Sequence, residues 1–467
     1  MTRPAPRQDA DSDPSSEADA GAGSAATAKA TVGGSLGRRV LGLALPALGA
    51  LIAEPLFLMA DSAIVGHLGV AELAGAGLGM TVVHTVIGLM IFLAYSTTPA
   101  VARRAGAGDL PGALAAGRDG LWLAVGLGAV VVAAGAVGAG PLIRGLGGSG
   151  EMEVHATAYV LGSLPGMPAM LMVLAATGML RGLLDTRTPL VVAAVGCGVN
   201  VVLNLALVYG AGLGVLGSAI GTSITQWLMA VAYLAILLPR LRRLEVSLRP
   251  DLGGVLRTAQ VGSWLMLRTV TLRVALIATV AVATHAGTLT LAAHQLVFTM
   301  FGTLAFALDS LAIAAQALIG NELGARNLAG ARLLTRTLTR WGLGFGVVVG
   351  AVLAGLAPFI APLFTPDPAV QHAFVAGMWV LALAQPLCGY VFVLDGVLIG
   401  AGDARYLALA GCLTLVPYLP ALVAVSMAGF GDGVGAIVPL WLAFGLVLMG
   451  ARALTLGLRA RTDGWMR

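Results

Sequence analysis

Residues 54–67 carry the sequence EPLFLMADSAIVGH, in which two carboxylates and a proline interrupt a long apolar run. On a helix, Glu54 and Asp61 are seven residues apart, about two turns, so they share one face roughly 10 Å apart. Pro55 removes a backbone hydrogen bond and gives the helix a place to bend. If this run lies in a membrane, each carboxylate costs several kcal/mol, which favours a functional reason for keeping it.

The composition indicates a polytopic membrane protein. The chain has 467 residues, of which 58% are hydrophobic and 10% charged, and its mean hydropathy is +0.92. A soluble protein has roughly a quarter of its residues charged. The net charge of +5 does not indicate nucleic acid, because the arginines stand at the ends of apolar runs, where membrane topology explains them. The expected environment is therefore the lipid bilayer.

A helix that crosses a bilayer needs about 20 apolar residues. Twelve stretches meet this requirement, and the sequence therefore predicts an all-α fold of twelve transmembrane helices. They cover residues 38–64, 73–101, 114–143, 155–180, 188–210, 213–238, 255–285, 289–319, 334–363, 370–399, 405–428 and 433–458.

The arginines lie mostly on one side of these spans, and Arg144 is the exception. By the positive-inside rule, the arginine-rich side is cytoplasmic, so both termini are predicted to be cytoplasmic. Residues 1–35 are rich in Pro, Ala, Ser, Asp and Gly without an apolar period, which predicts a disordered cytoplasmic tail.

The chain also repeats itself with an offset of 218 residues. Gly106-Ala107 matches Gly324-Ala325, and further matches follow the fourth and tenth spans. Six helices return the chain to its starting side, so the two copies insert in the same orientation, and such repeats around a site are typical of alternating-access transporters. The predicted parts are an N-terminal lobe at 36–238, a linker at 239–257 and a C-terminal lobe with a short tail at 258–467.

Asp61 is the strongest candidate for ion coupling. It lies 22 residues after Arg39, or about 33 Å along a helix, in the outer half of the membrane. A carboxylate there can take up a proton from outside and release it inside. The alternative is a structural carboxylate bonded to Ser62 or to asparagines of the fifth span. For Glu54, which lies deeper, the functional and structural readings are equally supported.

Other polar residues lie within the spans. Asn200 and Asn204 share a face of the fifth helix, where a direct role and hydrogen bonding between helices both stay open. His84 in the second span suits a proton switch, but a packed polar contact is the more frequent role.

In the second half, spans seven and eight run antiparallel across a short turn. The residue of span eight that lies at the same membrane depth as Arg268 is within one turn of Asp309. We therefore predict that Arg268 and Asp309 form an intramembrane pair with a mainly structural role. Gln295 extends this polar set and is a candidate cavity residue.

The sequence contains no Walker A nucleotide-binding loop and no His-Glu-x-x-His metalloprotease motif. Cys197, Cys388 and Cys412 stand alone without metal-ligand spacing. We expect no enzymatic activity, no cofactor and no metal site, and therefore an ion gradient as the energy source.

Five motifs together resemble the multidrug and toxic compound extrusion (MATE) transporters, closest to their DNA-damage-inducible bacterial branch. They cover about residues 36–460 and include the first-span stretch, LRGLLDTRTP at 180–189, Asn200 to Asn204, AHQ at 293–295, and LDG at 394–396 with GAGD at 400–403.

The resemblance implies two six-helix lobes in a V around a central cavity, and export of amphipathic, often cationic compounds in exchange for H⁺ or Na⁺. It places Asp61 on the family's coupling carboxylate and Asn200 in the same site. Asn204 departs from the pattern, because relatives commonly have an aspartate there, and this loss favours H⁺ over Na⁺. Glu54 is a candidate to replace part of that charge.

The predicted function is H⁺-coupled efflux by a monomer in a bacterial inner membrane. Two alternatives stay open: a Na⁺-coupled exporter of the same family, and a lipid or polysaccharide flippase of the same superfamily, which Arg268 and Arg273 would suit.

Overall fold

The computed structural model describes residues 14–466, with side chains described from Leu36 onward. Every regular element in residues 14–466 is helical, and this part of the chain contains no strand. Contacts divide the chain into two units, Met1–Gly42 and Leu43–Arg467.

The helices are numbered in chain order. The first half contains α1 (Pro14–Gly66), α2 (Val70–Met90), α3 (Phe92–Gly106), α4 (Leu110–Gly145), α5 (Gly150–Ser163), the 3₁₀ turn η1 (Leu164–Gly166), α6 (Met167–Gly182), α7 (Arg187–Leu205), the π-helical η2 (Ala206–Gly210) and α8 (Gly214–Arg243). The second half contains α9 (Leu252–Ala286), α10 (Thr288–Gly324), α11 (Leu328–Phe364), α12 (Pro368–Gly400), α13 (Ala404–Met427), α14 (Val434–Leu442), the π-helical η3 (Ala443–Leu448), α15 (Met449–Arg461) and the 3₁₀ turn η4 (Gly464–Met466).

The described helices form 12 candidate membrane spans, which confirms the predicted all-α architecture. Most spans are several residues longer than their apolar windows. The third, predicted at 114–143, covers Leu110–Gly145, because Asp109 caps its start by accepting a 2.8 Å hydrogen bond from the Gly112 amide. Polar first turns of this kind are helical, but a search for apolar stretches leaves them out of the predicted span.

The predicted disordered tail differs from the structure. Residues 1–13 lie outside the described residues, whereas α1 already begins at Pro14 and includes the rest of the predicted tail. This segment is rich in alanine, the strongest helix former, and a proline suits the first turn of a helix. These local preferences favour a helix in a segment whose overall composition indicates disorder.

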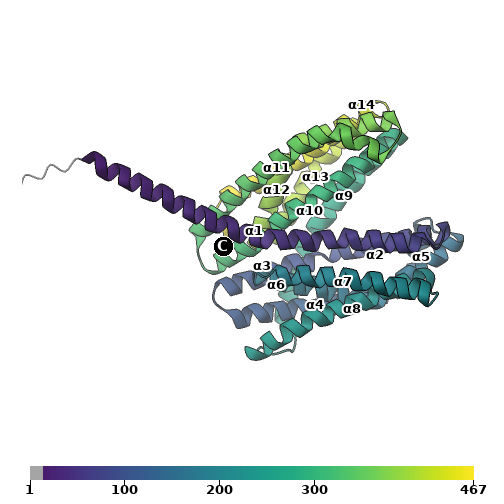
Figure 1. The fold of residues 1–467 in the computed structure, drawn as a ribbon, viewed down its shortest axis with the longest axis horizontal. Coiled ribbons are helices and arrows are strands. Elements are labelled where there is room, and N and C mark those ends of the chain that lie inside the picture. Colours follow the sequence, from purple (N-terminus) through teal and green to yellow (C-terminus); the bar gives the residue numbers. More distant parts are fainter. Residues whose placement is uncertain (1–13, 467) are drawn as a thin grey trace, which may run out of the picture. The chain divides into compact units, whose positions relative to one another are not determined.

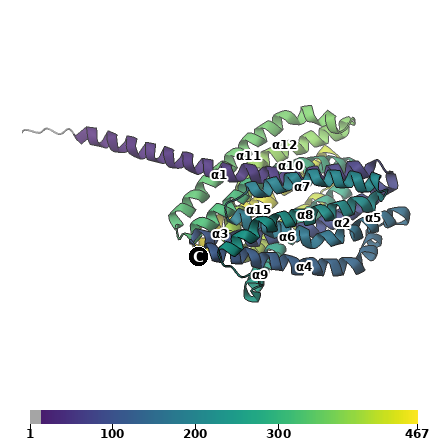
Figure 2. The same ribbon diagram turned by 60° about the horizontal axis from the view of Figure 1, so that its bottom comes forward.

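Within the Leu43–Arg467 unit, the ribbon of the first half (purple to teal) and that of the second half (green to yellow) form separate bundles (Figure 1). They meet mainly where α3 packs against α10 and α9, and where α4 packs against α9. Figure 2 shows α7 and α8 running side by side in the first bundle, in agreement with their packing.

Two repeat-related glycines lie in the contact between α3 and α10. A Cβ on Gly106 would lie 2.0 Å from the Asn321 carbonyl oxygen, and one on Gly324 would lie 1.9 Å from the Arg103 carbonyl oxygen. Gly106 and Gly324 are 218 residues apart, as are Arg103 and Asn321. The two halves therefore approach backbone to backbone, through a symmetric pair of contacts, at their arginine-rich ends.

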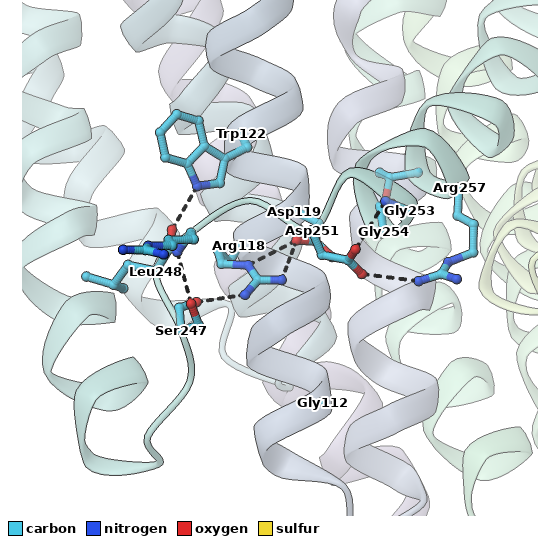
Figure 3. A network of polar contacts seen from close by, with 12 residues as sticks. Gly112, Arg118, Asp119, Trp122, Ser247, Leu248, Asp251, Gly253, Gly254 and Arg257 are labelled. Atoms are coloured by element: carbon cyan, nitrogen blue, oxygen red, sulfur yellow. Dashed lines mark hydrogen bonds and ion pairs between the residues drawn. The ribbon is translucent and has the colours of Figure 1, made fainter.

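The connection between the halves is shorter than the predicted 239–257, because α8 continues to Arg243 and α9 begins at Leu252. Figure 3 shows how it is held. Arg118 on α4 donates a 2.7 Å hydrogen bond to the Ser247 carbonyl, and Trp122 Nε1 donates one of 3.0 Å to the Leu248 carbonyl. Asp119 accepts two bonds from the Arg118 guanidinium. The connection is thus fastened to the first bundle.

Candidate functional site: a buried carboxylate among four helices

Asp61 on α1 is fully buried and accepts hydrogen bonds from three helices. Its Oδ2 accepts from the Tyr159 hydroxyl of α5 at 3.0 Å. Its Oδ1 accepts from Asn204 Nδ2 of α7 at 2.8 Å and from the Ser218 hydroxyl of α8. No Arg, Lys or His among the described residues lies within 4.0 Å of this carboxylate. All of its partners are uncharged donors.

A hydrogen-bonded chain continues away from Asp61. Asn204 Nδ2 also donates to Asn200 Oδ1 at 3.2 Å, and Asn200 Nδ2 donates to Thr222 Oγ1 of α8 at 3.2 Å. The i,i+4 spacing places both amides on one face of α7, as the sequence predicts. The structure therefore brings Asp61, Asn200 and Asn204 together in one network.

Asn204 has one unsatisfied atom. Its Oδ1 is buried and has no hydrogen-bond partner among the described residues. A Cβ on Gly221 of α8 would lie 2.1 Å from this oxygen, so glycine is needed there for the two helices to approach. An unpaired buried acceptor is costly, and a functional role is one explanation for its presence.

The end of α7 continues into the π-helical turn η2, which contains Tyr209. Its hydroxyl donates a hydrogen bond to the Ile64 carbonyl, one turn after Asp61 on α1. Single π-helical turns inside helices frequently occur near functional sites. Here the turn ties the end of α1 to the helix that carries the asparagines.

Glu54 is not part of this network. Its side chain is 52% exposed, and its nearest basic group is His84 on α2, with Glu54 Oε1 and His84 Nδ1 4.0 Å apart. Asp61 instead faces α5, α7 and α8. The structure thus places the two predicted carboxylates in separate environments, and it places His84 beside Glu54.

Gln295 is exposed on α10, and no described side-chain hydrogen bond joins it to Asp61. Its neighbour His294 is buried, packs between Phe298 and Trp441, and has no hydrogen-bond partner on either ring nitrogen among the described residues. Neither residue extends the polar network around Asp61.

The predicted pair of Arg268 and Asp309 is not formed. Arg268 on α9 donates from Nε and Nη2 to Asp395 on α12, and Arg452 Nη2 on α15 lies 3.2 Å from the same carboxylate. No described residue forms a hydrogen bond or ion pair with Asp309, although it is near enough to Arg181, Arg268 and Arg452 to interact electrostatically. Arg268 turns toward α12 and not toward α10, and the position of a residue along its helix does not determine this orientation.

Sequence reasoning missed two partners of Asp61, Tyr159 and Ser218. They are 98 and 157 residues away in the chain. Their hydroxyls gave one signal, since polar groups in apolar helices usually bond to a neighbouring helix. The sequence alone did not say which helices surround α1.

The fold and this site define a class: a membrane transporter with two six-span halves and a buried, uncompensated carboxylate in the first helix. Comparison with known proteins gives the family. The MatE family model, that of the multidrug and toxic compound extrusion transporters, matches residues 46–206 and 265–420. The chain belongs to this family, whose members are membrane transporters for toxic compounds and not enzymes.

Two relatives illustrate the similarity. The chloroplastic protein DETOXIFICATION 44 of Arabidopsis thaliana is 30% identical over 445 residues, which cover 90% of this chain and 83% of the relative. DNA damage-inducible protein F of Escherichia coli K12 is 30% identical over 380 residues, covering 78% of this chain and 80% of the relative.

Solved structures share the fold. The Vibrio cholerae MATE transporter VcmN in its bent form superposes with a TM-score of 0.83 at 21% identity, covering 93% of this chain and 99% of that one. A MOP superfamily transporter from Pyrococcus furiosus gives a TM-score of 0.81 at 22% identity, covering 91% and 95%.

Proposed function

We propose that this transporter exports amphipathic, often cationic compounds in exchange for protons, and that Asp61 carries the coupling proton. One observation supports the proposal above the others: Asp61 is fully buried among three uncharged donors, and no cation lies within 4.0 Å of it in the described part of the chain. An ionised carboxylate without a countercharge is expensive in a low-dielectric interior. Binding a proton removes that cost.

Protonation would also change the hydrogen bonding. An ionised carboxylate only accepts, whereas a protonated one donates from one oxygen. The three present donors suit the ionised form. After protonation, a rotated Asn204 amide would present its unpartnered oxygen to the new O–H group. Proton binding would in this way alter the contact between α1 and α7, and Pro55 gives α1 a place to bend in response.

A sodium ion is the other candidate for coupling. It would require several oxygen ligands around Asp61, and Asn200, Ser218 and Thr222 could supply some. Asn204, however, presents its nitrogen to the carboxylate. A sodium ion would need this amide to rotate before its oxygen could serve as a ligand, whereas a proton binds the carboxylate directly. In the described part of the chain, no three His, Cys, Asp or Glu side chains cluster so that they could hold a metal ion.

The decisive measurement uses purified protein in liposomes. Efflux of a fluorescent organic cation is followed under an imposed pH gradient. The assay is run once in sodium buffer and once with choline in place of sodium, at the same internal and external pH. We expect pH-driven transport without sodium, and its loss in Asp61→Asn. Glu54→Gln is the matched control, because it neutralises a carboxylate of the same helix outside the network. Normal pH-driven transport by Asp61→Asn would overturn the proposal.

We further propose a bacterial inner membrane as the location, with both termini in the cytoplasm and a monomer as the working unit. The asymmetric arginines support the orientation. A reporter fused to the C-terminus, assayed for cytoplasmic or external activity, tests it.

A further inference from the structure

A cavity of about 430 Å³ lies at the arginine-rich end of the second bundle, between α11, α12, α15 and η4. This volume falls within the range of small-ligand sites. Four guanidinium groups line it, those of Arg332, Arg336, Arg340 and Arg461. Asp463, Leu394, Trp465 and Met466 also belong to the lining.

Most of this positive charge has no carboxylate partner among the described residues. Arg332, Arg336 and Arg340 follow one another at intervals of four on one face of α11, and all are exposed. Arg332 Nη2 lies 2.8 Å from Asp463 Oδ1. Among the described residues, no carboxylate lies within 4.0 Å of the guanidinium of Arg336, Arg340 or Arg461.

The internal repeat provides a comparison. A related cavity in the first bundle is lined by Arg118, Leu121, Trp122 and Met172, among others. Each of these four positions has its counterpart, 218 residues later, in the lining of the second cavity: Arg336, Thr339, Arg340 and Tyr390. The two cavities are therefore the same feature of the repeated fold.

In the first bundle, the chain itself supplies the hydrogen-bond partners and the countercharge for the polar groups that line this cavity. Arg118 is bonded to Asp119 and to the Ser247 carbonyl, and Trp122 is bonded to the Leu248 carbonyl (Figure 3). The inter-half connection supplies both carbonyls, and the side chain of Asp119 neutralises the arginine. Nothing remains there for an external anion to neutralise.

In the second bundle, the corresponding partners have changed. The position of Asp119 is taken by Thr337, and that of Trp122 by Arg340. The second repeat thus has no carboxylate at the first position and has a guanidinium at the second. Where the first cavity holds one paired arginine, the second holds three arginines without a carboxylate partner. Such a site is complementary to an anion that comes from outside the chain.

The depth of the site indicates which anion. Helix α11 has 37 residues, or about 55 Å, whereas the hydrocarbon core is about 30 Å thick. Roughly eight residues at each end therefore extend beyond the core, which places Arg336 near the lipid headgroups and Arg340 about one turn deeper. Arginine side chains at this depth extend toward the interface.

We propose that this cavity binds the headgroup phosphate of an anionic phospholipid. Arg336 and Arg340 contact the phosphate, and Arg461 closes the site from α15. Basic cavities between transmembrane helices on the cytoplasmic side are suited to anionic headgroups. Arginines that only set topology would need neither a cavity nor the replacement of Asp119 by threonine in the second repeat.

The test is native mass spectrometry of the full-length protein in detergent, with phosphatidylglycerol added at increasing concentration. Phosphatidylcholine and inorganic phosphate are the comparison ligands. We expect one tightly bound phosphatidylglycerol, weak binding of phosphatidylcholine, and weak binding of inorganic phosphate. Arg336→Gln with Arg340→Gln should weaken this binding on the order of 30-fold.

The control is Arg242→Gln with Arg243→Gln, which removes the same charge from exposed arginines at the end of α8. It should leave the bound phosphatidylglycerol unchanged. Equal losses in both double variants, or retention in the cavity variant, would overturn the proposal, as would tighter binding of free phosphate than of the lipid. If the cavity variant does not fold, Arg340→Gln alone is measured. The outcome is independent of proton coupling at Asp61.

Discussion

Asn204 donates a hydrogen bond from Nδ2 to Asp61 Oδ1 at 2.8 Å, while its own Oδ1 stays without a partner in the described structure. The amide thus supports an ionised carboxylate without adding charge. An aspartate at this position would instead place two carboxylates face to face. That difference predicts a specific change in coupling.

In Asn204→Asp, two carboxylates 2.8 Å apart could not both ionise without a cation, so the pair should keep one proton to higher pH. We expect the midpoint of the transport pH profile to move to more alkaline values, and transport to become stimulated by sodium. The measurement is cation efflux from liposomes over a range of about three pH units centred on neutral pH, with and without sodium. An unchanged profile in both media contradicts this account.

Tyr159→Phe removes one donor from Asp61 Oδ2 and keeps the buried ring. A hydrogen bond to a charged group contributes about 1.5–3 kcal/mol, which corresponds to a shift of about one pH unit or more. Because the lost bond favours the ionised carboxylate, the midpoint of transport should move in the alkaline direction.

The matched control is Tyr233→Phe. Tyr233 is also buried, but its hydroxyl bonds to Thr177 at 3.0 Å, away from Asp61. It should lose some stability without moving the pH profile. The same shift in both variants would mean that packing, and not the bond to Asp61, sets the profile.

The corrected ion pair predicts opposite outcomes for two carboxylates. Asp395→Ala leaves Arg268 and Arg452 buried without their shared partner, and breaking a buried pair in this way costs about 3–5 kcal/mol. Asp309→Asn removes no described hydrogen bond, so its melting temperature should stay much closer to that of the parent chain. Thermal unfolding in detergent measures both. If Asp309→Asn were the more damaging change, the pairing described for Arg268 would be wrong.

The sequence predicts which residues form helices better than it predicts which side chains of different helices meet. Hydropathy locates twelve spans because the bilayer sets a minimum apolar length, and Asp61 stands out because charge is rare there. Which side chains meet depends on how each helix is rotated. Arg268 bonds to Asp395 and not to its predicted partner Asp309, and Tyr159 is distant in sequence from the carboxylate it contacts.

Asp432 lies in the loop before α14 and joins it to the start of α10. It accepts bonds from the Thr290 amide and hydroxyl, each at 2.7 Å, and from the Leu289 amide at 3.2 Å. Partial desolvation opposes ionisation, but these hydrogen bonds prevail and lower the pKa of Asp432. The carboxylate therefore caps α10 from another part of the chain.

Because the pKa of Asp432 is lower in the folded state than in the unfolded state, its contribution to stability is present above the unfolded value of about 3.9 and is lost as the pH falls through the folded value. Asp432→Ala should lower the free energy of unfolding by about 1 kcal/mol at neutral pH, as expected for a lost helix cap. Melting temperatures of the variant and parent should converge in acid. A difference that persists unchanged at the lowest pH would argue against the cap.

Gly324 tests how the two halves close at the arginine-rich end. A Cβ there would lie 1.9 Å from the Arg103 carbonyl, which belongs to the other half, so Gly324→Ala cannot keep the present contact between α3 and α10. If transport alternates between openings on the two sides, the substitution should favour the state that is open at this end. Ala317 is fully buried about two turns away on α10. In a chain in which Cys197, Cys388 and Cys412 are replaced by serine, the cysteine of Ala317→Cys should react faster with a water-soluble maleimide when Gly324→Ala is also present. Gly344→Ala on α11 is the control, since its Cβ would meet nothing within 4 Å. Equal labelling rates in the parent, Gly324→Ala and Gly344→Ala would show that this glycine contact does not control access.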